Sequence, residues 1–259
     1  PARAPPRLDD LGITRLEHWR RGVGNMHGLC LICGPTGSGK TTTLNASIRE
    51  MDRFGKSIYT VEDPVEYRIP YTDQVSVNTA TGLDFSRAVR AFMRADPDVI
   101  ILGEVRDADT ARNAVRARAP GHLVPAPLHT GWIFGAMSRL RDLEVPPQEL
   151  RFLLRAVLVQ SLVRTVCEDC GGTGSAADGK ACRHCYGSGY GGRTLVTECA
   201  SFMDPEEVDA AIAGKGSWPS MAEDAYGKMR QGITTEAELL RVLGTQAARL
   251  IERDRGGSG

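Results

Sequence analysis

Residues 34–42 have the types and spacing of a loop that binds phosphate groups. They are Gly34, Pro35, Thr36, Gly37, Ser38, Gly39, Lys40, Thr41 and Thr42. They match the pattern G-x-x-x-x-G-K-[ST], in which backbone N–H groups of a glycine-rich turn surround phosphate oxygens. We expect Lys40 to reach the outer phosphates and the Thr41 hydroxyl to hold Mg²⁺. The pattern therefore predicts ATP and Mg²⁺ as cofactors of this chain.

Two flanking elements must position this loop. The apolar run Leu29–Cys33 precedes it and predicts a strand, and the segment 41–52 follows it and predicts a helix. A helix that begins at the loop adds the positive end of its dipole to the phosphate site. A surface glycine turn could match the pattern by chance, but the order strand, loop, helix favours nucleotide binding.

Carboxylates follow two other predicted strands. Glu104 comes after the apolar strand Val99–Leu102, and Glu62 and Glu66 come directly after the short strand 56–61. Hydrolysis of a nucleotide needs a carboxylate that organises Mg²⁺ or the attacking water at the ends of neighbouring strands. These acids could instead belong to solvated turns, but their place behind buried strands favours a catalytic role.

Two histidines flank a further predicted strand, 123–128, which contains Pro125 and Pro127. Proline removes backbone donors and is unusual in a central strand. A single histidine is usually an ordinary polar residue, so His122 and His129 are candidates for contact with the nucleotide or its γ-phosphate only because of where they lie.

Four cysteines form two C-x-x-C pairs with 11 residues between the pairs. They are Cys167, Cys170, Cys182 and Cys185. Four thiolates with no open position are typical of a structural zinc site, so we predict bound Zn²⁺. His184 lies inside the second pair and could substitute as a ligand. Glycine-rich segments follow both pairs, as in the C-x-x-C-x-G-x-G repeats of the DnaJ zinc region, a similarity that we interpret as local convergence.

The remaining cysteines and the composition suggest an ordinary reduced, water-soluble protein. Cys30, Cys33 and Cys199 read as small buried hydrophobic residues. The chain has 259 residues, of which 32 are basic and 32 acidic, and this balance argues against a dedicated nucleic-acid binder. No apolar run reaches the roughly 18 residues of a membrane span, so we expect a cytoplasmic protein.

The order of predicted elements indicates an α/β fold with a P-loop (RecA-like) core, a zinc-binding tetracysteine module and an α-helical C-terminal portion. We predict further helices near 134–143, 148–162, 204–213, 221–231 and 235–243, and a helix capped by Asp109 that runs through 119. The predicted organisation is a linker (1–28) from a missing upstream domain, the core (29–165), the module (166–193), the helical portion (194–252) and a flexible tail (253–259).

Four segments together resemble the boxes of the secretion ATPase superfamily, in particular the type II secretion and type IV pilus assembly ATPases. The segments are 34–44, 60–67, 96–107 and 121–130. The resemblance implies that 34–41 is the Walker A loop, that Glu104 is the Walker B acid, and that Glu62 and Glu66 position or activate water. It also makes His122 and His129 the histidines of the family's His box, and it aligns Arg106 with an arginine after the Walker B acid.

The resemblance further implies an ATP-driven motor. It would work as a hexameric ring with an inner-membrane platform or adaptor protein, without a membrane span of its own, and peripheral to the inner membrane. Residues 1–28 resemble the end of the linker from an upstream domain that supplies arginines to the phosphates. The tetracysteine insertion favours an assembly motor over a retraction motor.

The His box departs from the family pattern at several positions. Pro120 replaces a threonine, Pro125-Ala126-Pro127 replaces Leu-Ser-Thr, and Gly131-Trp132-Ile133 replaces Asn-Asp-Ala. The loss of hydroxyls suggests slow or altered hydrolysis. A non-hydrolysing nucleotide-binding scaffold therefore stays open as an alternative. A P-loop nucleic-acid translocase of a conjugation or packaging system is a second alternative, against which the neutral net charge and the position of the cysteine module weigh.

Overall fold

The computed structural model describes residues 6–105, 107–117 and 121–256. Seven of its strands form one sheet in the order β3-β2-β4-β5-β1-β6-β7. Pairing is parallel throughout except between β6 and β7, which are antiparallel. The strands are β1 (Gly28–Cys33), β2 (Ile58–Glu62), β3 (Asp73–Ser76), β4 (Val99–Leu102), β5 (Leu123–Leu128), β6 (Leu154–Val166) and β7 (Tyr190–Ser201).

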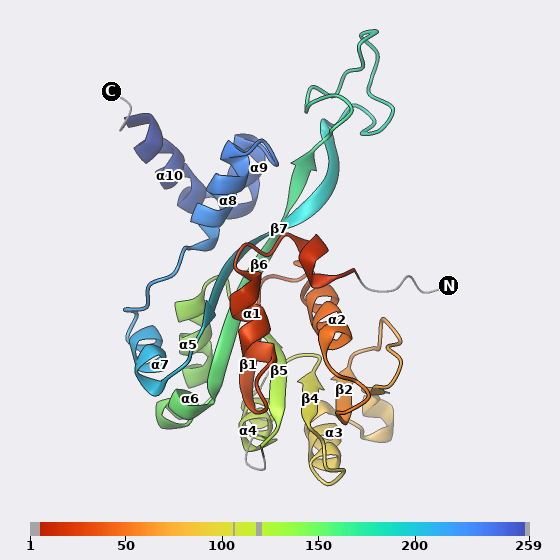
Figure 1. Cartoon of the computed structure of the whole chain (residues 1–259), viewed down its shortest axis with the longest axis vertical. Coiled ribbons are helices and arrows are strands. Elements are labelled where there is room, and N and C mark those ends of the chain that lie inside the picture. The colour runs from red at the N-terminus through yellow and green to blue at the C-terminus, as the bar shows by residue number, and fades with distance from the viewer. Residues whose placement is uncertain (1–5, 106, 118–120, 257–259) are drawn as a thin grey trace.

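Helices cover both faces of the sheet (Figure 1). Side chains of β1 alternate between the faces, so that Leu31 packs with one set of helices and Ile32 with the other. One face carries α3 (Phe85–Phe92), α4 (Ala108–Ala117), α5 (Ile133–Asp142), α6 (Pro147–Leu153) and α7 (Pro205–Ile212). The other carries the 3₁₀ turn η1 (Leu8–Leu11), α1 (Leu16–Val23) and α2 (Lys40–Glu50). A second 3₁₀ turn, η2, spans Thr79–Thr81.

Three C-terminal helices form a separate cluster on the outer part of β6 and β7. They are α8 (Met221–Arg230), α9 (Glu236–Leu243) and α10 (Thr245–Gly256), and they pack around Val163 and Val196. Strands β6 and β7 continue past this cluster as a long hairpin, and the segment 167–189 lies at its tip, far from the rest of the sheet (Figure 1).

The apolar segment after α6 is the main correction to the predicted elements. The helix predicted for 148–162 ends at Leu153, and the chain continues as strand β6, which lies between β1 and β7. Most of β6 is buried. A segment that is apolar at both odd and even positions fits a strand buried on both faces as well as it fits a buried helix. Pairing with β1 and β7 in the sheet makes this segment a strand.

The C-terminal region also differs from its prediction at both ends. Residues 194–201 of the portion expected to be helical belong to strand β7, and residues 245–256 form α10, which was not predicted. Helix α4 is capped by Asp107, whose Oδ1 accepts a hydrogen bond from the Thr110 amide at 2.7 Å, so the prediction of Asp109 as cap is wrong. Helix α3 is capped by Asp84, whose side chain accepts a hydrogen bond from the Arg87 amide.

Strand β5 is central even though it contains two prolines. Its amide at Leu123 donates to the Asp98 carbonyl, so odd-numbered residues of β5 face β4, and both Pro125 and Pro127 are odd-numbered. Even-numbered residues face β1, where all six residues of β5 keep their partners. The prolines therefore cost donors only on the β4 side, where Val99–Leu123 is the one pair between the described strands.

Candidate active site at the carboxyl edge of the sheet

The glycine loop (residues 34–41) joins the end of β1 to the start of α2. Gly34, Gly37 and Gly39 all have positive φ angles, of 146°, 78° and 87°. A Cβ atom on Gly34 would lie 2.2 Å from the Gln160 carbonyl oxygen, so at this position only glycine fits. At Gly37 the backbone conformation, and not space, requires glycine, because nothing lies within 4 Å.

Gln160 supports the glycine loop from behind, and sequence reasoning missed it. This buried side chain on β6 donates from Nε2 to the Ser38 carbonyl at 2.6 Å and accepts at Oε1 from the Thr43 hydroxyl at 2.9 Å. One amide group thus fixes both the loop and the first turn of α2. Its only sequence signal is a polar residue in an otherwise apolar run, in a segment predicted as helix.

The side chain of Lys40 lies against the glycine loop. Its Nζ donates to the carbonyl oxygens of Gly34 at 2.8 Å and Pro35 at 2.9 Å. Partial burial lowers the pKa of Lys40, and the nearby Glu104 carboxylate opposes this effect. The ammonium group is therefore placed at the loop itself, next to an acid that helps to keep it charged.

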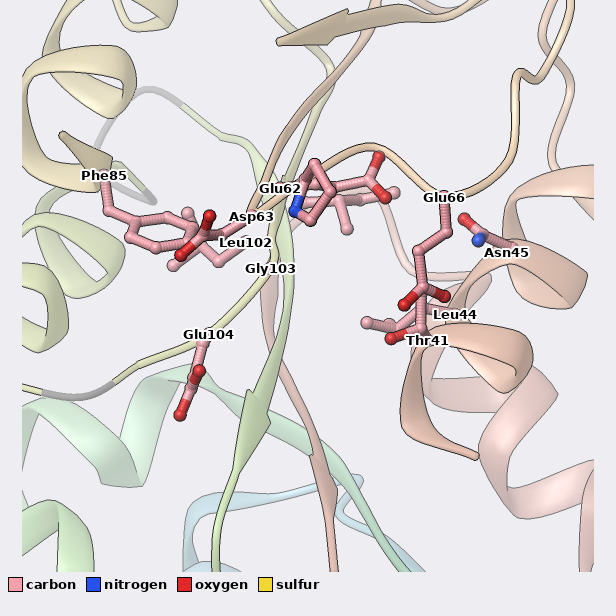
Figure 2. Close-up of a pocket in the computed structure, with 12 residues that line it drawn as sticks. Thr41, Leu44, Asn45, Glu62, Asp63, Glu66, Phe85, Leu102, Gly103 and Glu104 are labelled. Carbon is pink, nitrogen blue, oxygen red and sulfur yellow. The ribbon is translucent and has the colours of Figure 1, made fainter. Parts of the chain in front are cut away.

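The predicted acids line one pocket together with the loop (Figure 2). Thr41, Glu62, Glu66 and Glu104 all contribute to its wall. In Figure 2, Glu66 extends from the segment after β2 towards Thr41, and Glu104 lies across the pocket. The carboxyl ends of parallel strands meet at one edge of the sheet, which explains why acids distant in sequence converge here.

The environments of the acids differ. Glu62 is buried, and its Oε1 accepts hydrogen bonds from the Thr60 hydroxyl at 2.7 Å and from Gln74 Nε2 at 3.1 Å. Glu66 is exposed to solvent. Glu62 is thus a fixed carboxylate, whereas Glu66 is free to adjust its position.

Glu104 and His129 are brought into direct contact. His129 follows β5, Glu104 follows β4, and His129 Nε2 lies 2.7 Å from Glu104 Oε1. This contact bridges the two strands at the end where their ladder lacks donors. The backbone supplies one more bridge there, from the Val105 amide to the Pro127 carbonyl at 3.1 Å.

His122 is not brought to this pocket within the chain. It precedes β5, where its carbonyl accepts from the Gly28 amide, and its side chain is buried. A strand rises about 3.3 Å per residue, so His122 lies roughly 20 Å from His129, at the opposite edge of the sheet. Arg106 and Pro120, which the sequence also singled out, lie outside the described residues.

The four cysteines of the two C-x-x-C pairs form a cluster at the tip of the β6–β7 hairpin. All four sulfur atoms lie within 4.8 Å of one another, with 4.0 Å between Cys167 and Cys182 and 3.7 Å between Cys170 and Cys185. Four thiolates placed about 2.3 Å from one Zn²⁺ in a tetrahedron would be about 3.8 Å apart. The sulfur spacing therefore fits a tetrahedral metal.

The cluster is built from two copies of one local structure, related by 15 residues. The Gly174 amide lies 3.3 Å from Cys170 Sγ, and the Gly189 amide lies 3.3 Å from Cys185 Sγ. The copies also exchange backbone bonds, from Cys167 to Gly189 and from Cys182 to Gly174. His184 forms an ion pair with Asp169 at 3.3 Å. The group of side chains placed to hold a metal ion consists of the four cysteines and does not include His184.

The other cysteines are confirmed as buried core residues. Cys30, Cys33 and Cys199 are at most 1% exposed. Burial raises the pKa of each of these thiols to about 12, so they stay protonated and unreactive.

No helix among the described residues combines the length and the apolar character needed to cross a bilayer.

The comparisons with known proteins agree with one another. The family described as "Type II/IV secretion system protein" matches residues 5–249. The type II secretion system ATPase E of Vibrio cholerae is 39% identical over 91% of this chain and 52% of its own length. The type IV pilus assembly ATPase PilB of Thermus thermophilus is 38% identical over 91% of this chain and 30% of its own. The chain thus spans about half or less of these relatives.

Solved structures show the same fold. The pilus retraction motor PilT with bound ADP superimposes with a TM-score of 0.73 and 28% identity, over 93% of this chain and 67% of PilT. The ATPase DotB of Legionella pneumophila gives a TM-score of 0.70 and 25% identity, over 91% of this chain and 64% of DotB.

Proposed function

The chain belongs to the type II/IV secretion system protein family, and we propose that it is the ATP-hydrolysing motor domain of a type II secretion or type IV pilus assembly machine. The observation that carries the proposal is that Thr41, Glu62, Glu66 and Glu104 line one pocket at the carboxyl edge of the sheet, and that the charge of Lys40 interacts with the Glu104 carboxylate of its wall. A loop that binds phosphates and carboxylates that act on water are the two parts that hydrolysis requires.

The pocket offers groups that suit a nucleotide and Mg²⁺. Buried polar atoms without a partner among the described residues include Ser38 Oγ in the glycine loop and Asn45 Nδ2, and Asn45 lines the pocket. Such atoms are costly unless a ligand or water satisfies them. Mg²⁺ prefers oxygen ligands, and when bound it would neutralise phosphate charge. Thr41 and a carboxylate of the pocket would hold it.

Each residue then has a distinct role. Backbone amides of the glycine loop and Lys40 bind the phosphates, while Glu62, held by Thr60 and Gln74, keeps a carboxylate fixed at the pocket. Glu104 accepts the proton of the attacking water, and His129, in contact with it, orients that carboxylate. The flexible Glu66 assists in placing the water.

The assay is steady-state phosphate release by an assembled form of this chain and of its variants. Glu104→Gln should lower kcat by about 10²–10³-fold with nucleotide affinity retained, because it removes a proton acceptor without removing a phosphate contact. The matched control is Glu252→Gln, which changes an exposed acid of α10 in the same way and should leave the rate unchanged. Lys40→Ala sets the background rate.

A wild-type rate no higher than that of Lys40→Ala, in an assembled form that binds ATP, would overturn the motor proposal and favour the nucleotide-binding scaffold. We further propose a hexameric assembly, Zn²⁺ at the cysteine cluster, and an inner-membrane platform or adaptor as partner. The relatives named above are ATPases of secretion and pilus systems, which supports this setting. Sedimentation with and without ATP tests the assembly, and metal analysis tests the zinc.

A further inference from the structure

A second cavity lies at the edge of the sheet opposite the glycine loop. It has a volume of about 320 Å³ and lies between α1, the end of β7, α7 and the loop that leads to α8. Ser201, in its wall, pairs with Ala156 near the start of β6, whereas the glycine loop contacts β6 at Gln160. The cavity is therefore separate from the candidate active site, and its size suits a small organic ligand.

Arg15 supplies a fixed positive charge to this cavity. Its Nη1 donates to the Cys199 carbonyl at 3.0 Å, and its Nη2 lies 2.6 Å from His18 Nε2. A guanidinium has five N–H donors, so these two bonds leave others available to a ligand. The side chain is thus oriented by the protein and still able to donate.

The same contacts fix His18 and Ser201. Because the guanidinium can only donate, His18 Nε2 is the acceptor, and its proton is on Nδ1, which donates to Ser201 Oγ at 2.9 Å. The contact with the guanidinium needs the lone pair of Nε2 and therefore the neutral imidazole. Burial lowers the pKa of His18, and the charge of Arg15 lowers it further, although the Glu17 carboxylate, 3.8 Å from Nε2, raises it. The Ser201 hydroxyl accepts from His18 and keeps its own proton to donate.

A second positive charge comes from the loop between α7 and α8. Lys215 is exposed and lines the cavity, and its ammonium group has no partner among the residues that the structure describes. One lining carboxylate, Glu207, opposes these cations, and it accepts a hydrogen bond from the Met203 amide at 2.6 Å. The two positive charges of Arg15 and Lys215 exceed the one negative charge of Glu207.

Aromatic side chains complete the wall. Phe202 and Trp218 line the cavity and contact each other edge to face, with ring centroids 6.2 Å apart. The Trp218 indole is held by its bond to Glu198 Oε1 at 2.7 Å. The wall thus combines two cations and a hydroxyl donor with a rigid apolar surface.

We propose that this cavity binds the phosphate group of a small organic phosphate, with Arg15, Lys215 and Ser201 as donors and the Phe202–Trp218 surface against the organic part. A phosphate monoester has three terminal oxygens, one for each of these three donors, whereas a carboxylate has only two. The ligand would join α1 to the loop before α8, so it would tie the N-terminal segment to the C-terminal helices. This site is independent of the proposed hydrolysis.

The chain's three tryptophans provide the test, since each reports a different place. Trp218 lines the cavity, Trp132 follows His129 near the candidate active site, and Trp19 contacts Ser47 on α2. Inorganic phosphate is titrated into the whole chain with ¹⁵N-labelled indoles, at constant ionic strength. We expect a saturable shift of the Trp218 signal, whereas phosphate at the glycine loop would move the Trp132 signal.

Lys215→Gln should raise the phosphate concentration at half-saturation about fivefold, the effect of losing one charge-assisted contact near the surface. This exposed lysine has no described partner, so the fold should be kept, which an unchanged Trp218 signal without phosphate would verify. Lys180→Gln removes one positive charge from the segment 167–189 at the tip of the β6–β7 hairpin, away from the cavity, and serves as the control.

Three results would overturn the proposal: no saturable shift of Trp218, equal effects of the two lysine variants, or acetate binding at this site as tightly as phosphate. Arg15→Gln gives an independent check and should weaken the same shift.

Discussion

Replacing Glu238 by glutamine tests how the C-terminal helices are held to the hairpin. Glu238 lies on α9 with its side chain fully buried, and it binds two arginines. Arg164 on β6 donates to Glu238 Oε2 from Nε at 2.9 Å and from Nη2 at 2.6 Å, and Arg241 donates from Nε at 2.8 Å and from Nη2 at 2.6 Å. The Arg164 amide also donates to Glu238 Oε1.

The pKa of Glu238 gives the size of the effect. Burial alone would raise this pKa, but the hydrogen bonds from Arg241 and Arg164 dominate and lower it from 4.5 to about 2. Such a shift corresponds to about 3 kcal/mol. Both guanidinium groups are about half exposed and partly screened, so we expect Glu238→Gln to lower the free energy of unfolding by about 2 kcal/mol at pH 7.

The pH dependence has a definite sign. Because the pKa is lower in the folded chain, the charged carboxylate stabilises the fold above pH 4.5, and this contribution is lost as the pH falls towards 2. The difference between wild type and Glu238→Gln should therefore shrink in the acid range. Urea unfolding followed by circular dichroism, at pH 7 and at stepwise lower pH, measures it.

Glu236→Gln is the matched control. Glu236 lies on the same helix and also pairs with an arginine, Arg255, at 2.7 Å, but this pair is exposed and should contribute less than about 1 kcal/mol. Equal losses of stability in the two variants, or a loss in Glu238→Gln that stays constant from pH 7 into the acid range, would show that the buried Glu238 carboxylate does not stabilise the fold through its two arginines.

Three further predictions concern the glycine loop and the cysteine cluster. Gln160→Leu should weaken nucleotide binding about tenfold, because the Ser38 carbonyl and Thr43 lose their buried partner; an unchanged affinity in a nucleotide titration would contradict this. Gly34→Ala should abolish nucleotide binding, since its methyl group would meet the Gln160 carbonyl, whereas Gly37→Ala should cost only about 1 kcal/mol of stability because its surroundings are open. A metal chelator should expose residues 167–189 to limited proteolysis, and identical digestion with and without chelator would argue against a structural metal.

Local sequence rules predicted the elements that carry the candidate site. The glycine pattern predicted the phosphate-binding loop, and the position of Glu62 and Glu104 directly after apolar runs predicted them as site residues. Both signals depend only on neighbours in the sequence. The strand at 154–166 could not be recognised in the same way. Its apolar run has no preference between helix and strand, and its partners β1 and β7 are distant in sequence.

Residues that act through long-range contacts also escaped prediction. Gln160 supports a loop more than a hundred residues away, and Lys228 is nearly buried where its Nζ binds the carbonyls of Gly12 and Leu195. Neither residue type nor spacing signals such roles. The contact of His129 with Glu104 was equally invisible, although both residues were candidates, since it depends on the order of strands in the sheet.

The two prolines of β5 reduce the number of backbone hydrogen bonds that connect two parts of the sheet. On one side of them lie β3, β2 and β4, which carry Glu62 and Glu104, and on the other lie β5, β1, β6 and β7, which carry the glycine loop and His129. Between the two halves the backbone is joined at Val99–Leu123 and at Val105–Pro127. A nucleotide held by one half and acted on by the other would therefore span the seam where the sheet resists sliding least, so strain generated at the phosphates would act directly on that seam.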